Sequence, residues 1–190
     1  MAKTASSMLP LGTLAPQFSL RNVITDTLET LTGHEDAKAT VIFFICNHCP
    51  YVKHVIHELI RLAADYTTQQ VRFLAINSND QETYPDDSPT HMKDTAIALA
   101  YPFPYLFDET QEVARAYQAT CTPDLFVFDT HLNLAYRGQL DDSRPGNNIP
   151  VTGSSVREAL YCLLNNQSVS LDQKPSLGCN IKWRGTLSHT

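Results

Sequence analysis

The chain has 190 residues, enough for one domain with a substantial hydrophobic core. Its formal net charge is −6 and it has no cluster of Lys or Arg, which argues against binding to nucleic acid or to an anionic membrane surface. No stretch approaches the roughly 18 apolar residues of a membrane span, and the N-terminus lacks the apolar run of a signal peptide. Five cysteines, an odd number, are unlike a disulfide-stapled secreted scaffold, so we expect a cytoplasmic protein.

The first predicted element is an N-terminal β-hairpin. Residues 1–16 contain Ser, Thr, Pro and Gly and are predicted to be loosely held. Alternating residues at 18–20, a turn at 25–27 and a returning segment at 28–31 predict the hairpin itself. Six β-branched and aromatic residues at 40–45 then predict a strand that is buried on both faces, as in a parallel sheet.

A long amphipathic helix is predicted next, because apolar residues recur at i, i+3, i+4 and i+7 between Val52 and Tyr66. The rest of the chain continues to alternate between strands and helices. Strands or extended segments are predicted at 71–76, 103–107, 125–128 and 134–137, and helices after Ser88–Pro89, after the Asp108–Gln111 capping box, and after a capping box of Ser155 and Glu158 through Leu164. This order predicts an α/β fold in which right-handed crossovers place the parallel strands side by side, with the hairpin at one edge.

Two cysteines, Cys46 and Cys49, lie where the buried strand gives way to the long helix. Unpaired backbone N–H groups and the positive end of the helix dipole favour a thiolate there. We expect Cys46 to be the exposed, attacking thiolate with a lowered pKa, and Cys49 to be the buried thiol that resolves the mixed disulfide. His48 lies between them, and when protonated it would place a positive charge near Cys46 and make the disulfide a stronger oxidant.

Metal binding is the rival interpretation of this motif. Cys46, His48 and Cys49, with His54 and His57 on the helix, are all residue types that bind zinc or copper. A structural zinc site usually needs a second ligand pair after a longer spacer, and no second CxxC follows. We therefore favour a redox-active disulfide, with no metal and no cofactor, over a metal-binding module.

The CxxC motif at a strand-to-helix junction, together with Thr122-Pro123 before a late strand, resembles the thioredoxin superfamily. The chain is more similar to the redoxin branch of this superfamily, the alkyl hydroperoxide reductase and thiol-specific antioxidant family. This similarity lies in the sequence of residues 11–18, in the hairpin and in the segment 81–105. Within that branch, the CNHCP motif, the DETQE turn at 108–112 and the Gly-Cys-x-Ile-Lys-Trp tail resemble a group of peroxiredoxin-like thioredoxin-domain proteins.

This resemblance implies a thioredoxin-like domain over residues 10–165, with a mixed central sheet flanked by helices and a C-terminal tail, 166–190, packed on it. It also implies that Pro123 follows a cis peptide bond and faces the redox pair, although only about 5–6% of X–Pro bonds in folded proteins are cis. Thr122 would offer backbone hydrogen bonds to a substrate strand. The implied partners are protein or small-molecule thiols and disulfides, with peroxides as an alternative.

Departures from the family patterns favour disulfide exchange over peroxide reduction. Ile45 stands where thioredoxins have Trp, and residues 40–45 hold no buried carboxylate to accept a proton. The peroxiredoxin pattern Pro-x-x-x-Thr/Ser-x-x-Cys fits neither Cys46 nor Cys49. The alternative remains a peroxiredoxin-like antioxidant peroxidase in which Cys46 is the peroxidatic cysteine and forms a sulfenic acid.

Two further cysteines are candidate redox thiols. Cys121 lies two residues before Pro123 and should be near the CxxC motif, but a small buried packing role is favoured. Cys179 lies in the tail near Trp183 and either folds back as a resolving thiol or anchors the tail.

Three charged residues, Arg137 and the pair Asp141-Asp142, are candidate polar groups of the active site. A solvated loop is the favoured interpretation of all three.

Overall fold

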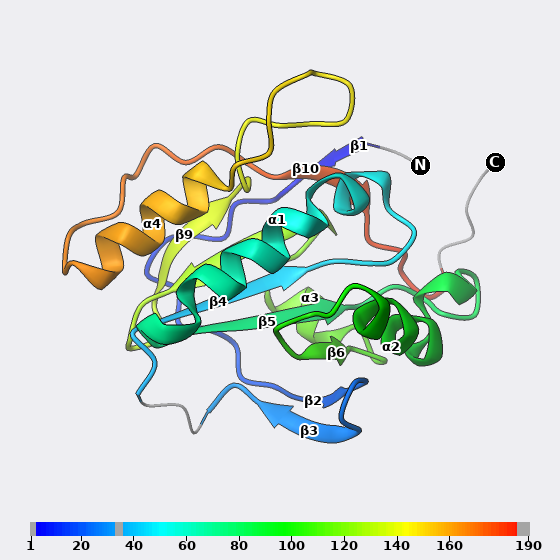
Figure 1. The fold of residues 1–190 in the computed structure, drawn as a ribbon. Coiled ribbons are helices and arrows are strands. Elements are labelled where there is room, and N and C mark those ends of the chain that lie inside the picture. Colours follow the sequence, from blue (N-terminus) through cyan, green and yellow to red (C-terminus); the bar gives the residue numbers. More distant parts are fainter. Residues whose placement is uncertain (1–2, 33–35, 186–190) are drawn as a thin grey trace.

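The computed structural model describes residues 3–32 and 36–185 and contains two β-sheets, with helices on both faces of the larger one (Figure 1). The larger sheet has seven strands in the order β3-β2-β6-β5-β4-β8-β9. In that order they are Thr27–Thr30, Ser19–Asn22, Tyr105–Phe107, Val71–Asn77, Ala39–Phe44, Asp124–Phe128 and Leu134–Gly138. Strands β4, β5 and β6 are parallel, whereas β8 and β9 are antiparallel additions, so the predicted thioredoxin-like fold with a mixed sheet is confirmed.

Strand β4 is central because all six of its residues are buried, as expected for a strand covered on both faces. It pairs with β5 on one side and β8 on the other. The predicted hairpin forms as β2 and β3 and lies at one edge of the sheet. The sheet therefore presents the end of β4, which leads into the CxxC motif, near the middle of the molecule.

Among the described residues, four α-helices cover the sheet: α1 (Pro50–Tyr66), α2 (Pro89–Ala98), α3 (Glu112–Ala116) and α4 (Ser154–Leu164). The apolar stripe of α1 packs on one face, where Leu59 and Leu62 are fully buried together with Leu160 of α4. Burying one such leucine contributes about 1.5–3 kcal/mol. A second core on the other face gathers Phe44 and Tyr117 beside α3. None of the helices in the described part of the chain is long and apolar enough to cross a membrane.

The smaller sheet joins the two ends of the chain. Its strands are β1 (Lys3–Ala5), β10 (Leu177–Asn180) and β7 (Cys121–Thr122), in the order β1-β10-β7. The prediction that residues 1–16 are loosely held is therefore wrong for β1, and the tail contains a strand that its sequence pattern did not indicate. Both segments are short and are stabilised by pairing with distant residues, which local periodicity does not reveal. The division into a domain over 10–165 and a tail over 166–190 stays a prediction, and residues 186–190 lie outside the described residues.

The start of α4 also differs from expectation. The predicted capping box of Ser155 is wrong, because the helix is preceded by Gly153 in a left-handed conformation with φ +66°. The carboxylate of Asp141 accepts hydrogen bonds from the backbone N–H groups of Thr152 (2.6 Å) and Gly153 (2.7 Å). Asp141 is 2% exposed, so the expectation of a solvated residue at this position is wrong as well.

Candidate active site

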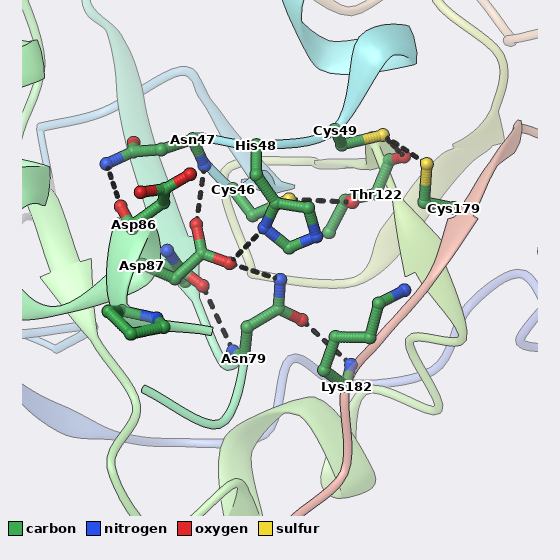
Figure 2. A network of polar contacts seen from close by, with 12 residues as sticks. Cys46, Asn47, His48, Cys49, Asn79, Asp86, Asp87, Thr122, Cys179 and Lys182 are labelled. Atoms are coloured by element: carbon green, nitrogen blue, oxygen red, sulfur yellow. Dashed lines mark hydrogen bonds and ion pairs between the residues drawn. The ribbon is translucent and has the colours of Figure 1, made fainter. Parts of the chain in front are cut away.

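The junction of β4 and α1 places both cysteines of the CxxC motif against Thr122 (Figure 2). The Cys46 sulfur lies 3.3 Å from the Thr122 hydroxyl, and the Cys49 thiol lies 3.2 Å from the Thr122 carbonyl oxygen. The Thr122–Pro123 peptide bond is cis, which confirms the prediction for Pro123. The loop before β8 therefore faces the redox pair.

Both thiols are buried, with Cys46 2% exposed and Cys49 0% exposed. The prediction of an exposed Cys46 is therefore wrong. The reason is that Cys46, two residues after β4, contacts Thr122 of β7, and only one wall of a neighbouring pocket reaches it.

The charge distribution within the pair also differs from the prediction. The pKa of Cys49 is lowered to about 5, chiefly because the Cys46 thiol hydrogen-bonds to it; the Cys179 thiol and the backbone N–H of Val52 act in the same direction, against the opposing effect of burial. The pKa of Cys46 is raised well above its ordinary value by that same hydrogen bond, by burial and by the negative charge of Asp87. Both shifts favour a thiolate on Cys49, which directly precedes the first residue of α1, and the shift of Cys46 is opposite to the predicted lowering of its pKa.

Asp87 is a site residue that the sequence analysis missed. Its fully buried carboxylate accepts hydrogen bonds from the backbone N–H of Asn47 (2.7 Å), from His48 Nδ1 (2.6 Å) and from Asn79 Nδ2 (2.8 Å). Burial opposes its ionisation, but hydrogen bonds from His48 and Asn79 hold the pKa of Asp87 below its ordinary value. The loop 81–89 has only a polar composition to signal such a role, so the contact with the CxxC motif becomes visible only in the folded chain.

His48 is held by this carboxylate on one side and by an aromatic ring on the other. Its ring stacks on Tyr84 with centroids 5.1 Å apart and an interplanar angle of 11°. Any positive charge on His48 faces the carboxylate of Asp87. A redox-tuning role for His48 stays a prediction.

In the described part of the chain, three possible metal-ligand atoms that all lie within 4.8 Å of one another come from Cys46, His48 and Asp87. This set differs from the predicted ligands in having Asp87 in place of Cys49. His54 bonds Ser143 Oγ at 2.7 Å instead of joining the group. A metal ion at this place would compete with the three hydrogen bonds that Asp87 already accepts.

Cys179 is brought to the site by β10. Its sulfur lies 2.8 Å from that of Cys49, and the residue is 3% exposed (Figure 2). In the ladder between β10 and β7, Cys179 is the partner of Thr122. The edge that was expected to bind a substrate strand through Thr122 is thus occupied by the chain itself, which corrects that expectation.

The other candidates contact other groups. Cys121 is buried, contacts the carbonyl oxygen of Pro123 at 3.6 Å and has a pKa raised by burial, all of which fits a packing role. Arg137 is fully buried, 3.5 Å from the buried carboxylate of Asp124, so its assignment to a solvated loop is wrong. Asp142 is exposed, as expected, and pairs with Lys174.

A pocket of about 340 Å³ opens beside Cys46, between α1 and α2. Its apolar walls include Val52, Ile56, Leu99 and Tyr101, and its polar lining includes Lys53, His91 and Asp94. Ligand pockets in proteins typically measure about 300–1,000 Å³, so this one suits a small molecule.

Comparisons with known proteins agree with the fold. The profile of the AhpC/TSA family matches residues 11–137. The crystal structure of an uncharacterized conserved protein from Geobacillus kaustophilus is 59% identical, with a TM-score of 0.96 and coverage of 98% of this chain and 99% of that chain. A hypothetical protein from Sinorhizobium meliloti is 42% identical, with a TM-score of 0.94 and coverage of 96% and 100%.

A more distant structure shares the fold alone. A putative thiol:disulfide interchange protein DsbE from Chlorobium tepidum is 16% identical, with a TM-score of 0.65 and coverage of 83% of this chain and 99% of that chain. A comparison with curated proteins gives no match.

Proposed function

Because the chain belongs to the AhpC/TSA family of the thioredoxin-like redoxins, we propose that it is a thiol-disulfide oxidoreductase in which Cys46 and Cys49 cycle between two thiols and one disulfide. The observation that supports this most directly is that both sulfurs meet at Thr122, before the first turn of α1, while the pKa of Cys49 is lowered to about 5. Disulfide exchange requires a thiolate, and here a thiolate lies in contact with a second thiol.

The reaction begins at Cys46, because Cys46 and not Cys49 lines the pocket. As a substrate disulfide approaches, the Cys46 thiol passes its proton to the Cys49 thiolate, and the Cys46 sulfur attacks one substrate sulfur. The substrate S–S bond breaks, and the leaving thiolate takes the proton from Cys49. The regenerated Cys49 thiolate then attacks Cys46, the mixed disulfide breaks and the second substrate thiolate leaves, taking a proton from water. The protein is oxidised by two electrons and the substrate is reduced by two.

The surroundings of Cys46 favour a small disulfide over a protein strand. A strand cannot pair with Thr122 while β10 occupies that edge, whereas the pocket beside Cys46 is open to a small molecule. Asp87 acts as a positioning residue, because it holds the backbone N–H of Asn47 and the ring of His48 between the two cysteines.

Mass spectrometry after mixing reduced protein with oxidised glutathione tests this function. We expect a Cys46–Cys49 disulfide and two released glutathione molecules. The Cys49→Ser variant should stop at a glutathione adduct on Cys46, and the Cys46→Ser variant should react far more slowly. Cys162→Ser, on α4 away from the site, is the matched control. Equally fast reaction of the Cys46→Ser variant would overturn the assignment of Cys46 as the attacking residue, and an unreactive wild-type protein would overturn the function.

Peroxide reduction is the second candidate, since the matching family is named for alkyl hydroperoxide reductase and a lowered thiol pKa also suits reaction with peroxide. A peroxidase would form a sulfenic acid rapidly with one equivalent of hydrogen peroxide in the Cys49→Ser or the Cys46→Ser variant. We expect slow oxidation of both variants, because neither cysteine has the hydroxyl and proline pattern of the peroxiredoxins.

A further inference from the structure

Strand β10 lies very close to the loop that faces the redox pair. It is sandwiched between β1 and β7, and Cys179 is paired with Thr122. A Cβ atom on Gly178 would lie 2.0 Å from the Thr122 carbonyl oxygen, a distance that no side chain tolerates. Glycine at this position is what lets the backbone of β10 approach so closely. The result is a cysteine carried into the site by a strand that cannot easily withdraw.

The sulfurs of Cys179 and Cys46 both contact the sulfur of Cys49. The Cys179 sulfur lies 2.8 Å from Cys49 Sγ, and the Cys46 thiol also hydrogen-bonds to Cys49. Cys49 therefore contacts two thiols, either of which is placed to form a bond with it. A small movement would bring the sulfurs of Cys49 and Cys179 to the bonding distance of about 2.05 Å.

The two flanking thiols differ in their access to substrate. Cys46 lines the pocket between α1 and α2, whereas Cys179 lies on β10, between β1 and β7 in the smaller sheet, and is 3% exposed. An external disulfide can reach Cys46 through the pocket. Among the described residues, the sulfur contact of Cys179 is with Cys49.

We propose that Cys179 is a third redox-active thiol, which exchanges with the Cys46–Cys49 disulfide to form a Cys49–Cys179 disulfide. The inference rests on the proposed function, which supplies the first disulfide. Cys179 loses its proton and its sulfur attacks Cys49 Sγ. The Cys46–Cys49 bond breaks, and Cys46 leaves as a thiolate that takes up the proton. The step is an isomerisation within three sulfurs, so no external oxidant or reductant is consumed.

This exchange has a chemical consequence for the site. It moves the disulfide from the pocket wall to the protected space under β10 and returns Cys46 to the thiol state. The oxidised protein then presents a free thiol to the pocket. This thiol can attack a further small disulfide, forming a mixed disulfide with one half of it and releasing the other half as a thiol.

Peptide mapping separates the two disulfides. In a Cys162→Ser protein, trypsin leaves Cys46 and Cys49 within one peptide, 39–53, and Cys179 in another, 158–182, because the Lys174–Pro175 bond resists cleavage. The protein is reduced, oxidised with one equivalent of oxidised glutathione, and alkylated at low pH before digestion. A Cys46–Cys49 disulfide gives an unlinked peptide 39–53 with no alkyl group. A Cys49–Cys179 disulfide links the two peptides and leaves one alkyl group on Cys46.

We expect the linked species to form after the unlinked one and to disappear in a Cys179→Ala variant, which keeps a side chain that fits β10. A Cys46→Ser protein oxidised with diamide provides a second measurement, in which the linked peptides should form without competition. If Cys179 is fully alkylated in every oxidised sample while peptide 39–53 carries its internal disulfide, the third-thiol proposal is overturned and the proposed function stands. If neither disulfide forms, the proposed function itself fails.

Discussion

At the scale of single residues, the pKa of Cys49 is set by the hydrogen-bond donors around its sulfur. The Cys46 thiol, the Cys179 thiol and the backbone N–H of Val52 all favour a thiolate on Cys49, and together they outweigh the cost of burying its charge. Proximity to a helix start is shared by both cysteines of the motif, so that feature alone does not decide which of them is ionised.

Titration of the reduced protein at 240 nm, where thiolates absorb, should show an inflection near pH 5. Cys49→Ser should remove this inflection. Cys46→Ser should move it to higher pH, because the hydrogen bond from Cys46 is the largest cause of the lowered Cys49 pKa. Since the pKa of Cys49 is lower in the folded chain than in the unfolded one, its contribution to stability is complete above about pH 8.5 and is lost as the pH falls through about 5. An inflection that survives Cys49→Ser and vanishes in Cys46→Ser would contradict the assignment.

Asp87 provides a second test at this scale. Asp87→Asn keeps the shape of the side chain but removes the charge that raises the pKa of Cys46, so that pKa should fall. Alkylation of Cys46 by iodoacetamide, followed against pH by mass spectrometry, measures the change. The neighbouring Asp86→Asn variant is the control, and an identical Cys46 profile in both variants would show that the Asp87 charge is irrelevant.

Asp87→Asn should also affect stability. Weakening the buried hydrogen bonds should cost about 1–3 kcal/mol of unfolding free energy at neutral pH. Because the pKa of Asp87 is lowered on folding, the stabilising effect of its charge is present above the ordinary value of about 3.9 and is lost as the pH falls through the lower folded value. In urea unfolding, the unfolding free energies of the wild-type protein and of Asp87→Asn should therefore converge at acid pH.

At the scale of elements, β10 closes the site, and its position depends on Gly178. Gly178→Ala should push the strand away from Thr122 and expose Cys179, because the added methyl group would overlap a backbone carbonyl rather than a movable side chain. We expect faster alkylation of Cys179 in the folded, reduced protein and a lower melting temperature. Gly185→Ala is the control: no atom lies within 4 Å of its added Cβ, although its φ of +79° also brings some strain. Equal protection of Cys179 in both variants would refute this dependence on Gly178.

At the scale of the whole molecule, a buried ion pair ties the sheet to the N-terminal segment. Arg137 on β9 faces Asp124 on β8 and donates hydrogen bonds to Ser7 Oγ (2.9 Å) and to the carbonyl oxygen of Gln118 (3.1 Å). Burial raises the pKa of Asp124 to about 7, although the Arg137 charge acts against this rise. The charge of Asp124 is thus tolerated largely through its partner.

Arg137→Met should therefore destabilise the protein by about 3–5 kcal/mol at pH 8, because it leaves a buried carboxylate without a partner. The loss should be smaller at pH 5, where Asp124 is protonated: a pKa raised on folding favours the folded state at low pH, and this contribution is lost as the pH rises through about 7. The double variant Arg137→Met with Asp124→Asn should recover part of the loss in urea unfolding. No recovery would show that the cost comes from lost packing and hydrogen bonds instead.

Much of the molecule follows from local pattern. The apolar run of β4, the stripe of α1 and the hairpin are short-range features, and each predicted its element correctly. The same pattern located the two cysteines at the strand-to-helix junction. These features are determined by the sequence because periodicity and side-chain size act over a few residues. The cis bond before Pro123 was implied by the resemblance to the thioredoxin superfamily.

Only the tertiary structure decided which cysteine has the lowered pKa, that Asp87 holds the motif, and that Cys179 meets Cys49. The contacts of Asp87 with His48 and of Cys179 with Cys49 join residues 39 and 130 positions apart in the chain, which the loop before α2 and β10 bring together. The pKa of a buried thiol depends on the donors and charges around it in space, and the sequence alone does not specify that arrangement.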